Sequence, residues 1–170
     1  MGRIYSITGE NLTITTTLPL VQMMPSATEL AAGGRIKIKR VELFQRANAT
    51  SAMQSFALCK RTAGTTFTLT SVTPVNLDSG GLASIFAGGT DGTAALSCGV
   101  ACSADTNGAY ATIYLVANFN SLNGWLWIPT PGEEIIIHAS ASSLGNFCIK
   151  PILQPTTLTG WSFNLVYEEL

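Results

Sequence analysis

The sequence predicts an all-β protein, a single-domain β-sandwich or jelly-roll-like barrel with a long loop-rich excursion at about residues 73–107. Runs of about four to eight residues rich in Thr, Ile, Val, Tyr and Phe recur along the chain, separated by Gly, Asn, Asp or Pro. Helical periodicity is nearly absent, and the best helical candidate, residues 26–32, is short. The 170 residues suffice for one domain with a sizeable core.

Three segments carry the clearest strand signals. In residues 11–17, Leu12 and Ile14 share one face while threonines occupy the other. Residues 161–167 alternate large apolar and mostly polar side chains, so we expect the last strand to face the core and hold the C-terminus in a sheet. Residues 109–118 are apolar on both sides, which is typical of a strand in the middle of a sheet.

A parity change marks the strand that carries most of the basic residues. Ile36 and Ile38 share one parity, whereas the apolar positions from Val41 onward are shifted. One extra residue in a strand produces such a shift, so we expect a β-bulge near Lys39 and Arg40. The alternative is that two separate strands meet at this point.

Loop and turn compositions set the remaining boundaries. Between residues 73 and 107 the strand pattern weakens into Gly-, Ser- and Asp-rich stretches, which predicts a projecting excursion or irregular pairing. Asn107-Gly108 and Asn123-Gly124 are tight-turn signals. The second turn is expected to connect the strand at residues 109–118 to a short Trp-containing strand at residues 125–128.

The composition favours a surface that other molecules cover. Charged residues make up 11% of the chain, against about 25% in an average globular domain. The 46% hydrophobic content and net charge of −1 exclude the signature of intrinsic disorder. No apolar run is long enough to span a bilayer, and the first residues lack the apolar core of a secretory signal, so we expect no membrane partner.

Charge is unevenly distributed along the chain. Residues 1–61 carry eight basic and three acidic side chains, and residues 62–170 carry one basic and seven acidic side chains. One interpretation is that the two halves pair within the folded molecule. The other is that they form complementary faces that meet between neighbouring molecules.

Residues for catalysis or cofactor binding are scarce. His138 is the only histidine, which disfavours Ser or Cys nucleophiles with a His base and multi-histidine zinc sites. The cysteines, at positions 59, 98, 102 and 148, do not have zinc-ribbon spacing, and we expect buried reduced thiols, with a disulfide as the alternative. No glycine-rich nucleotide-binding motif is present. We therefore expect no catalytic residue, no metal and no cofactor.

One basic cluster comprises Arg35, Lys37, Lys39, Arg40 and Arg46, with Lys60 and Arg61 as further candidates. Its first four residues are a candidate partner interface. Its interpretations are a solvated strand face, a contact with an acidic protein surface, or a nucleic-acid site. The negative net charge and the lack of interleaved aromatic residues argue against nucleic acid.

Four segments resemble a group of small β-rich virion structural proteins from tailed bacteriophages. They are residues 2–6, 36–45, 124–137 and 165–169, and the Trp-x-x-x-Pro-Thr-Pro-x-Glu-Glu element within the third is the most specific. The resemblance implies a non-catalytic sandwich or jelly-roll body that clusters in oligomers and decorates or cements a capsid. The excursion at residues 73–107 departs from shorter members of this group.

The resemblance implies specific partners and a location. We expect binding to a major capsid protein or another virion protein, in a virion assembled in the host cytoplasm. The weakly charged surface adds the expectation of self-association, preferably as a homotrimer. Pro129 and Pro131 stiffen the connection after the Trp strand, which is either a plain connector or a contact site. An alternative function is a receptor- or carbohydrate-binding module of a tail, neck or fibre, with Trp125 and Trp127 stacking on sugars.

Overall fold

The computed structural model describes residues 2–24, 35–47, 50–63, 67–78, 84, 97–138 and 147–170. These residues form twelve β-strands and no helix, which confirms the all-β prediction. The helix candidate at residues 26–32 lies outside the described residues. Within these ranges, no helix long and apolar enough to cross a bilayer is found.

The strands are β1 (Arg3–Leu12), β2 (Val21–Met24), β3 (Arg35–Gln45), β4 (Met53–Ala63), β5 (Phe67–Ser71), β6 (Val75–Asn76), β7 (Ser97–Asp105), β8 (Ala109–Asn120), β9 (Trp125–Trp127), β10 (Ile136–His138), β11 (Phe147–Pro151) and β12 (Trp161–Glu169).

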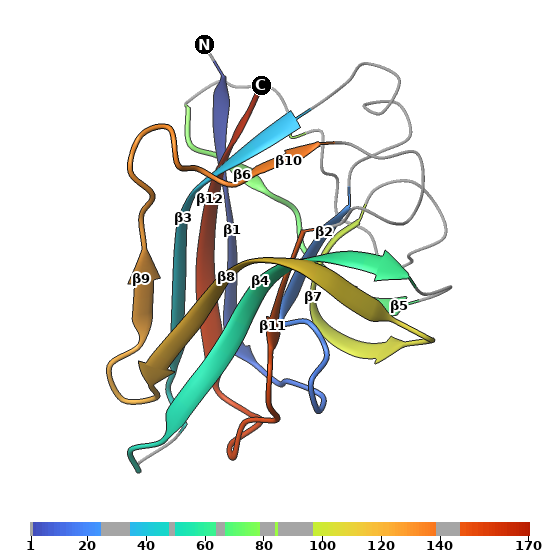
Figure 1. Ribbon diagram of the computed structural model, residues 1–170, viewed down its shortest axis with the longest axis vertical. Helices are drawn as coiled ribbons and strands as arrows, with labels where there is room; N and C mark the ends of the chain where they lie inside the picture. Colours follow the sequence, from blue (N-terminus) through green and yellow to red (C-terminus); the bar gives the residue numbers. More distant parts are fainter. Residues whose placement is uncertain are drawn as a thin grey trace.

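Two six-stranded antiparallel sheets pack together as a β-sandwich (Figure 1). Sheet A has the order β10-β3-β12-β1-β6, and β9 also pairs with β3. Sheet B has the order β5-β7-β2-β11-β4-β8. The sheets do not close into a barrel. Of the two architectures predicted from sequence, the protein therefore adopts the sandwich.

Eight of these strands are connected as a jelly roll. Strands β1, β12, β3 and β9 are neighbours in sheet A, and β2, β11, β4 and β8 are neighbours in the same order in sheet B. The links β1–β2, β3–β4, β8–β9 and β11–β12 each cross from one sheet to the other. These eight strands therefore pass back and forth between the two sheets around one core, as in a jelly roll. The remaining four strands add to the edges of the two sheets.

The main core lies between the sheets and includes the aromatic face of β12. Trp161 is fully buried and packs against Phe56, with ring centroids 4.9 Å apart, and edge-on against Phe119 at 6.4 Å. The indole Nε1 of Trp161 donates a hydrogen bond to the Thr157 carbonyl at 2.9 Å, which satisfies its polar atom. The predictions that β12 faces the core and holds the C-terminus in a sheet are confirmed, since β12 pairs with both β1 and β3.

The predicted β-bulge is also confirmed. In the β3–β12 ladder, Val166 pairs with Arg40 and Tyr167 pairs with Ile38, so Lys39 is the extra residue. The bulge lets both Ile38 and Val41 face the core, where both are fully buried.

Two other strand predictions are wrong. Residues 11–17 do not form one strand, because β1 ends at Leu12 and Thr16, in the turn that follows, has a positive φ. The positive φ of Asn11 lies at an irregularity within β1, where the register with β12 shifts. Residues 109–118 belong to β8, which lies at the edge of sheet B and not in its middle. The second apolar face of β8 has a local cause, because Tyr110 packs against a small cluster of Ala57, Cys59 and Cys148.

The loop-rich excursion is shorter than predicted at its C-terminal end. Residues 97–105 form β7, which pairs with β2 and β5. Ser, Gly and Ala dilute the strand pattern there, but Cys98 and Val100 alternate into the core, so tertiary pairing overrides the weak propensity. Residues 79–83 and 85–96 lie outside the described residues. The predicted turns at Asn107-Gly108 and Asn123-Gly124 do connect β7 to β8 and β8 to β9.

Candidate interaction surface

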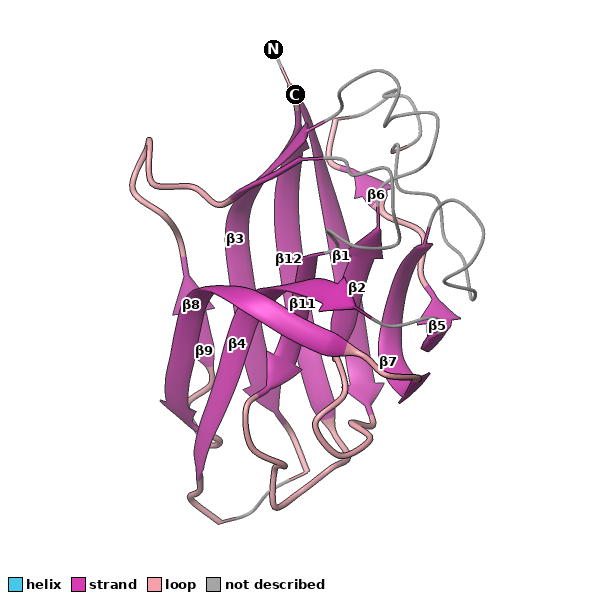
Figure 2. Cartoon of the chain, turned by 45° about the vertical axis from the view of Figure 1, so that its right-hand side comes forward, coloured by secondary structure: helices cyan, strands magenta, loops and turns pink. Residues whose placement is uncertain are grey.

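Strand β3 brings the predicted interface residues together. Its first part pairs with β10, through Lys37 and Ile136, and its middle part pairs with β9, through Leu43 and Trp125. The connection between β9 and β10 stands out from the sandwich beside this strand (Figures 1 and 2). The residues that this arrangement gathers along one side of sheet A are Arg35, Lys37, Lys39, Arg40, Trp125, Trp127, Pro129 and Pro131.

Glu134 anchors the β9–β10 connection to the basic strand. Its carboxylate lies 3.2 Å from Lys39 Nζ and 3.8 Å from Lys37 Nζ, and it accepts a hydrogen bond from the Gly132 amide at 2.7 Å. Backbone hydrogen bonds from its own amide and from Gly132, followed by Lys39 and Lys37, lower the pKa of Glu134. Two of the four predicted basic residues therefore hold this connection in place.

The uneven charge along the chain is partly balanced within the molecule. Lys39 also lies 3.8 Å from the Glu168 carboxylate, and Arg61 is paired with Asp105, so the basic first part of the sequence meets the acidic second part in both places. Arg40 is paired with Glu42 at 3.3 Å. Internal pairing, one of the two interpretations of the charge pattern, thus accounts for several of these basic groups.

The tryptophans of β9 point inward and expose their neighbours. Trp125 and Trp127 are half-buried and pack against the main core. Leu126 and Ile128, which alternate with them, are 57% and 63% exposed. Phe44 of β3 is 39% exposed and lines a shallow hollow of about 210 Å³ together with Leu126. We call Phe44, Leu126 and Ile128 the β9 surface.

A polar groove lies beside the β9 surface, on the outer face of sheet A. Its volume is about 480 Å³, and β1, β3 and β12 line it. Asn164 Nδ2 donates to Glu42 at 3.2 Å within it, and an exposed Arg46–Glu10 ion pair forms part of its lining. Phe44 belongs to both the groove and the hollow.

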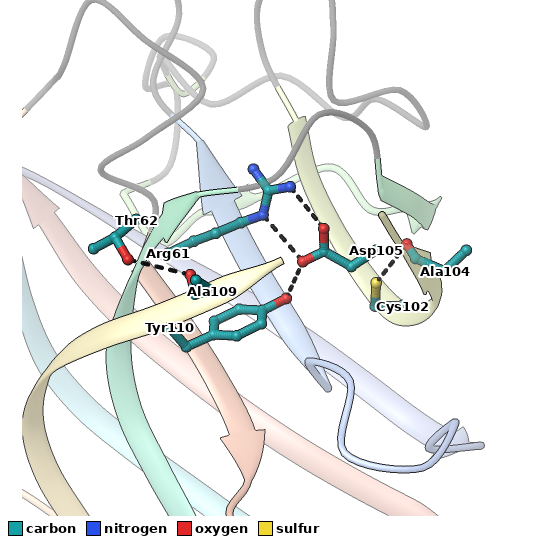
Figure 3. Close-up of polar contacts among 7 residues, drawn as sticks. All are labelled: Arg61, Thr62, Cys102, Ala104, Asp105, Ala109 and Tyr110. Atoms are coloured by element: carbon teal, nitrogen blue, oxygen red, sulfur yellow. Dashed lines mark hydrogen bonds and ion pairs between the residues drawn. The ribbon is translucent and has the colours of Figure 1, made fainter. Parts of the chain in front are cut away.

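The sequence analysis did not predict a buried charged cluster in sheet B (Figure 3). Arg61 of β4 donates from Nε and Nη2 to the Asp105 carboxylate at 3.1 and 2.7 Å, and both side chains are at most 1% exposed. The Tyr110 hydroxyl donates to the same carboxylate. Burial alone would lower the pKa of Arg61, but the hydrogen bond and charge of Asp105 outweigh it and raise the pKa. Burial, followed by the bond to Asp105, raises the pKa of Tyr110.

This cluster explains how the turn between β7 and β8 is held. β7 and β8 are consecutive in the chain but are separated by β2, β11 and β4 in sheet B. Sheet B must therefore curl so that Asp105, at the end of β7, reaches Arg61 of β4. Lys150 of β11 contributes from the same face, with its Nζ 4.8 Å from the centroid of the Tyr110 ring. The residues lie far apart in sequence, so no local pattern could have revealed the cluster.

The cysteines are buried, as predicted, and the structure contains them as free thiols. Cys59 and Cys148 are direct neighbours across the β4–β11 ladder. Burial raises the pKa of Cys59 to about 11 and that of Cys148 well above its usual value, so neither thiol has the character of a nucleophile. His138 lies exposed on β10. Among the described residues, no cluster of three or more His, Cys, Asp and Glu side chains is placed to hold a metal.

Comparisons with known proteins add no identification: no family model matches the chain, and no curated protein or solved structure is significantly similar to it.

Proposed function

We propose that the protein is a non-enzymatic structural component of a bacteriophage particle that attaches to a larger protein assembly through the β9 surface. More specifically, we propose that it is a decoration or cement protein that binds the major capsid protein and bridges capsomers. The resemblance of four sequence segments to small virion proteins supports this role. So does the jelly-roll connectivity, a fold used by capsid and lectin domains, although a fold alone does not determine function.

The observation that carries the proposal is the exposed apolar β9 surface on a rigid support. Leu126 and Ile128 are more than half exposed, while the alternating Trp125 and Trp127 are anchored against the core. Burying apolar area is worth about 25 cal/mol per Å², and a rigid surface loses little conformational entropy on binding. Such a patch beside polar groups is typical of a protein-binding site.

The surrounding charges give the contact a polar rim. Glu42, which lies opposite Leu126, is paired with Arg40. Lys37 and Lys39, farther along β3, are paired with Glu134, so the rim has few uncompensated charges to offer a partner. Exposed ion pairs typically contribute only about 0–1 kcal/mol each. We therefore expect attachment to depend mainly on apolar burial and to persist at high salt.

A binding assay with purified particles tests this proposal. The double variant Leu126→Asp, Ile128→Asp should lose particle binding by about 100-fold or more, because two carboxylates would have to be desolvated in the interface. Val75→Asp is the matched control, since Val75 is 61% exposed on β6 at the opposite side of sheet A. Equal binding by both variants would contradict the proposal.

The copy number per particle is a second test. A cement protein should be present in numbers close to those of the capsid protein, whereas a tail or fibre component should be present in far fewer copies.

A second candidate function is carbohydrate recognition at a tail or fibre. The polar groove favours it, because the partly exposed aromatic side chain of Phe44 lines the groove together with the amide of Asn164 and the carboxylate of Glu42. This location differs from the one expected from sequence, since Trp125 and Trp127 pack inward. Titration of the protein with host cell-surface oligosaccharides, comparing wild type with Phe44→Ala, tests it. Unchanged binding in the variant would exclude the groove.

A further inference from the structure

The edge strand β8 has the character of a central strand. Among the described residues it pairs only with β4, yet its twelve residues include no charged side chain and no proline. Natural proteins usually protect long edge strands with charges, prolines or short length, because the open backbone groups pair readily with another strand. Ile113 and Val116 are 56% and 42% exposed on this strand. The prediction that β8 lies in the middle of a sheet is wrong for the single chain. The composition of β8 is nevertheless that of a strand with neighbours on both sides.

The ladder defines which backbone groups of β8 are open. Ser121 N–H donates to the Ala52 carbonyl at 2.9 Å, and the register continues as Gln54 with Phe119 and Phe56 with Ala117. In an antiparallel ladder, hydrogen-bonded pairs alternate with pairs whose backbone groups point away. Val116 and Asn118 are in the second class, so their N–H and C=O groups point to the open edge of sheet B.

We propose that a second copy of the chain pairs antiparallel with β8, with Val116 next to Asn118 of the second copy about a two-fold axis at Ala117. In this register, every open N–H and C=O of these two residues finds a partner. The two sheets B then form one continuous sheet, and each β8 becomes a central strand. Its irregular part does not take part, because register shifts and the positive φ of Thr112 distort residues 109–113.

The charge distribution favours a second copy over a charged peptide as the occupant. Described charges are concentrated on sheet A and its connections, whereas the strands of sheet B carry Lys60, Arg61, Asp105 and Lys150. Of these, Arg61 and Asp105 neutralise each other in the interior. Two copies that meet at β8 therefore bring no like charges opposite each other within the paired strands, and β8 offers no charge to attract a charged peptide.

This pairing gives a dimer, whereas the composition favoured a trimer. The inference does not depend on the proposed function, because β8 belongs to sheet B and the β9 surface to sheet A. Failure of particle binding would leave the dimer intact, and loss of the dimer would leave the β9 surface in place.

Sedimentation velocity over a concentration series tests the inference. We expect the wild-type chain to be a dimer at tens of micromolar. Val116→Lys should weaken the dimer by about 100-fold or more, since each copy would place an ammonium group at the paired edge. The matched control is Val75→Lys on the edge strand β6, which should remain dimeric. A monomeric or trimeric wild type, or a dimer that survives Val116→Lys, would overturn the inference.

A second measurement does not rely on disruption. The paired variant Val116→Cys, Asn118→Cys should form a disulfide-linked dimer under mild oxidation, because the proposed register brings the two positions within the roughly 5.5–6 Å Cα separation that a disulfide prefers. The two substitutions lie on the exposed side of the edge, and near-UV circular dichroism checks that the fold is kept. Val75→Cys should remain unlinked. Absence of the linked dimer in the paired variant would overturn the register.

Discussion

Removal of Asp105 tests how the buried charged cluster holds the turn between β7 and β8. In wild type, the Arg61 guanidinium and the Asp105 carboxylate make two hydrogen bonds with side-chain exposures of 0% and 1%. Asp105→Ala leaves the Arg61 charge buried with this carboxylate gone and also removes the acceptor of the Tyr110 hydroxyl. Breaking a buried pair in this way typically costs about 3–5 kcal/mol of the free energy of unfolding. That is a large part of the roughly 5–15 kcal/mol that stabilises a typical domain.

Urea denaturation followed by Trp fluorescence measures this cost. With an m-value of about 2 kcal/mol/M, the midpoint should fall by about 2 M. The matched control is Glu10→Ala, which removes the carboxylate of the exposed Arg46–Glu10 pair, whose side chains are 59% and 73% exposed. Solvent screening should keep its cost below about 1 kcal/mol.

A paired replacement separates the charge effect from a packing effect. Arg61→Met combined with Asp105→Leu removes both charges, and replacing a buried ion pair with apolar residues is often close to neutral. We therefore expect the double variant to recover most of the stability lost in Asp105→Ala. A loss in Asp105→Ala no larger than that in Glu10→Ala would refute the argument that the cluster is desolvated.

Three further predictions follow from the core, the thiols and the β9–β10 connection. Trp161→Ala should cost about 3–5 kcal/mol in a denaturant melt, because it truncates a fully buried aromatic; a loss below about 1 kcal/mol would mean that β12 does not face the core. The thiols of Cys59 and Cys148 should resist a disulfide reagent at about pH 8 until the protein unfolds, since burial raises the pKa of Cys59 to about 11, and fast labelling of the folded protein would contradict this. Backbone hydrogen bonds and Lys39 lower the pKa of Glu134. The ionised Glu134 carboxylate therefore adds to the free energy of unfolding above the usual carboxyl pKa, and this contribution is lost as the pH falls through the lowered pKa. Melting curves should show Glu134→Gln to be less sensitive to acid than wild type, and identical acid dependence would argue against the anchor.

Local patterns predicted those features of the fold that depend on one strand at a time. The inward face of β12 followed from alternation, because a one-residue slip would expose Trp161 and its apolar neighbours. The bulge at Lys39 followed from a change of parity within β3. Residues 11–17 show the limit of this reasoning, since β1 ends at Leu12 and Thr16 has a positive φ despite the alternation.

The candidate interaction surface was predicted in part. The sequence analysis placed it around the basic strand and the Trp-Pro segment, and β3 does bring these residues to one side of sheet A. It assigned the exposed role to Trp125 and Trp127, whereas Leu126 and Ile128 face solvent. Alternation identifies two faces of a strand, but it does not say which face a core will cover when both are apolar.

The sequence by itself determined that this chain forms an all-β fold, because period-two alternation and turn residues are properties of neighbouring positions in the chain. Only the tertiary structure decided that β8 lies at an edge, that Glu134 pairs with Lys37 and Lys39, and that Asp105 reaches Arg61. These features depend on which distant strands become neighbours. That choice is made by packing of the whole core and by the curl of sheet B, and no local stretch of sequence records it.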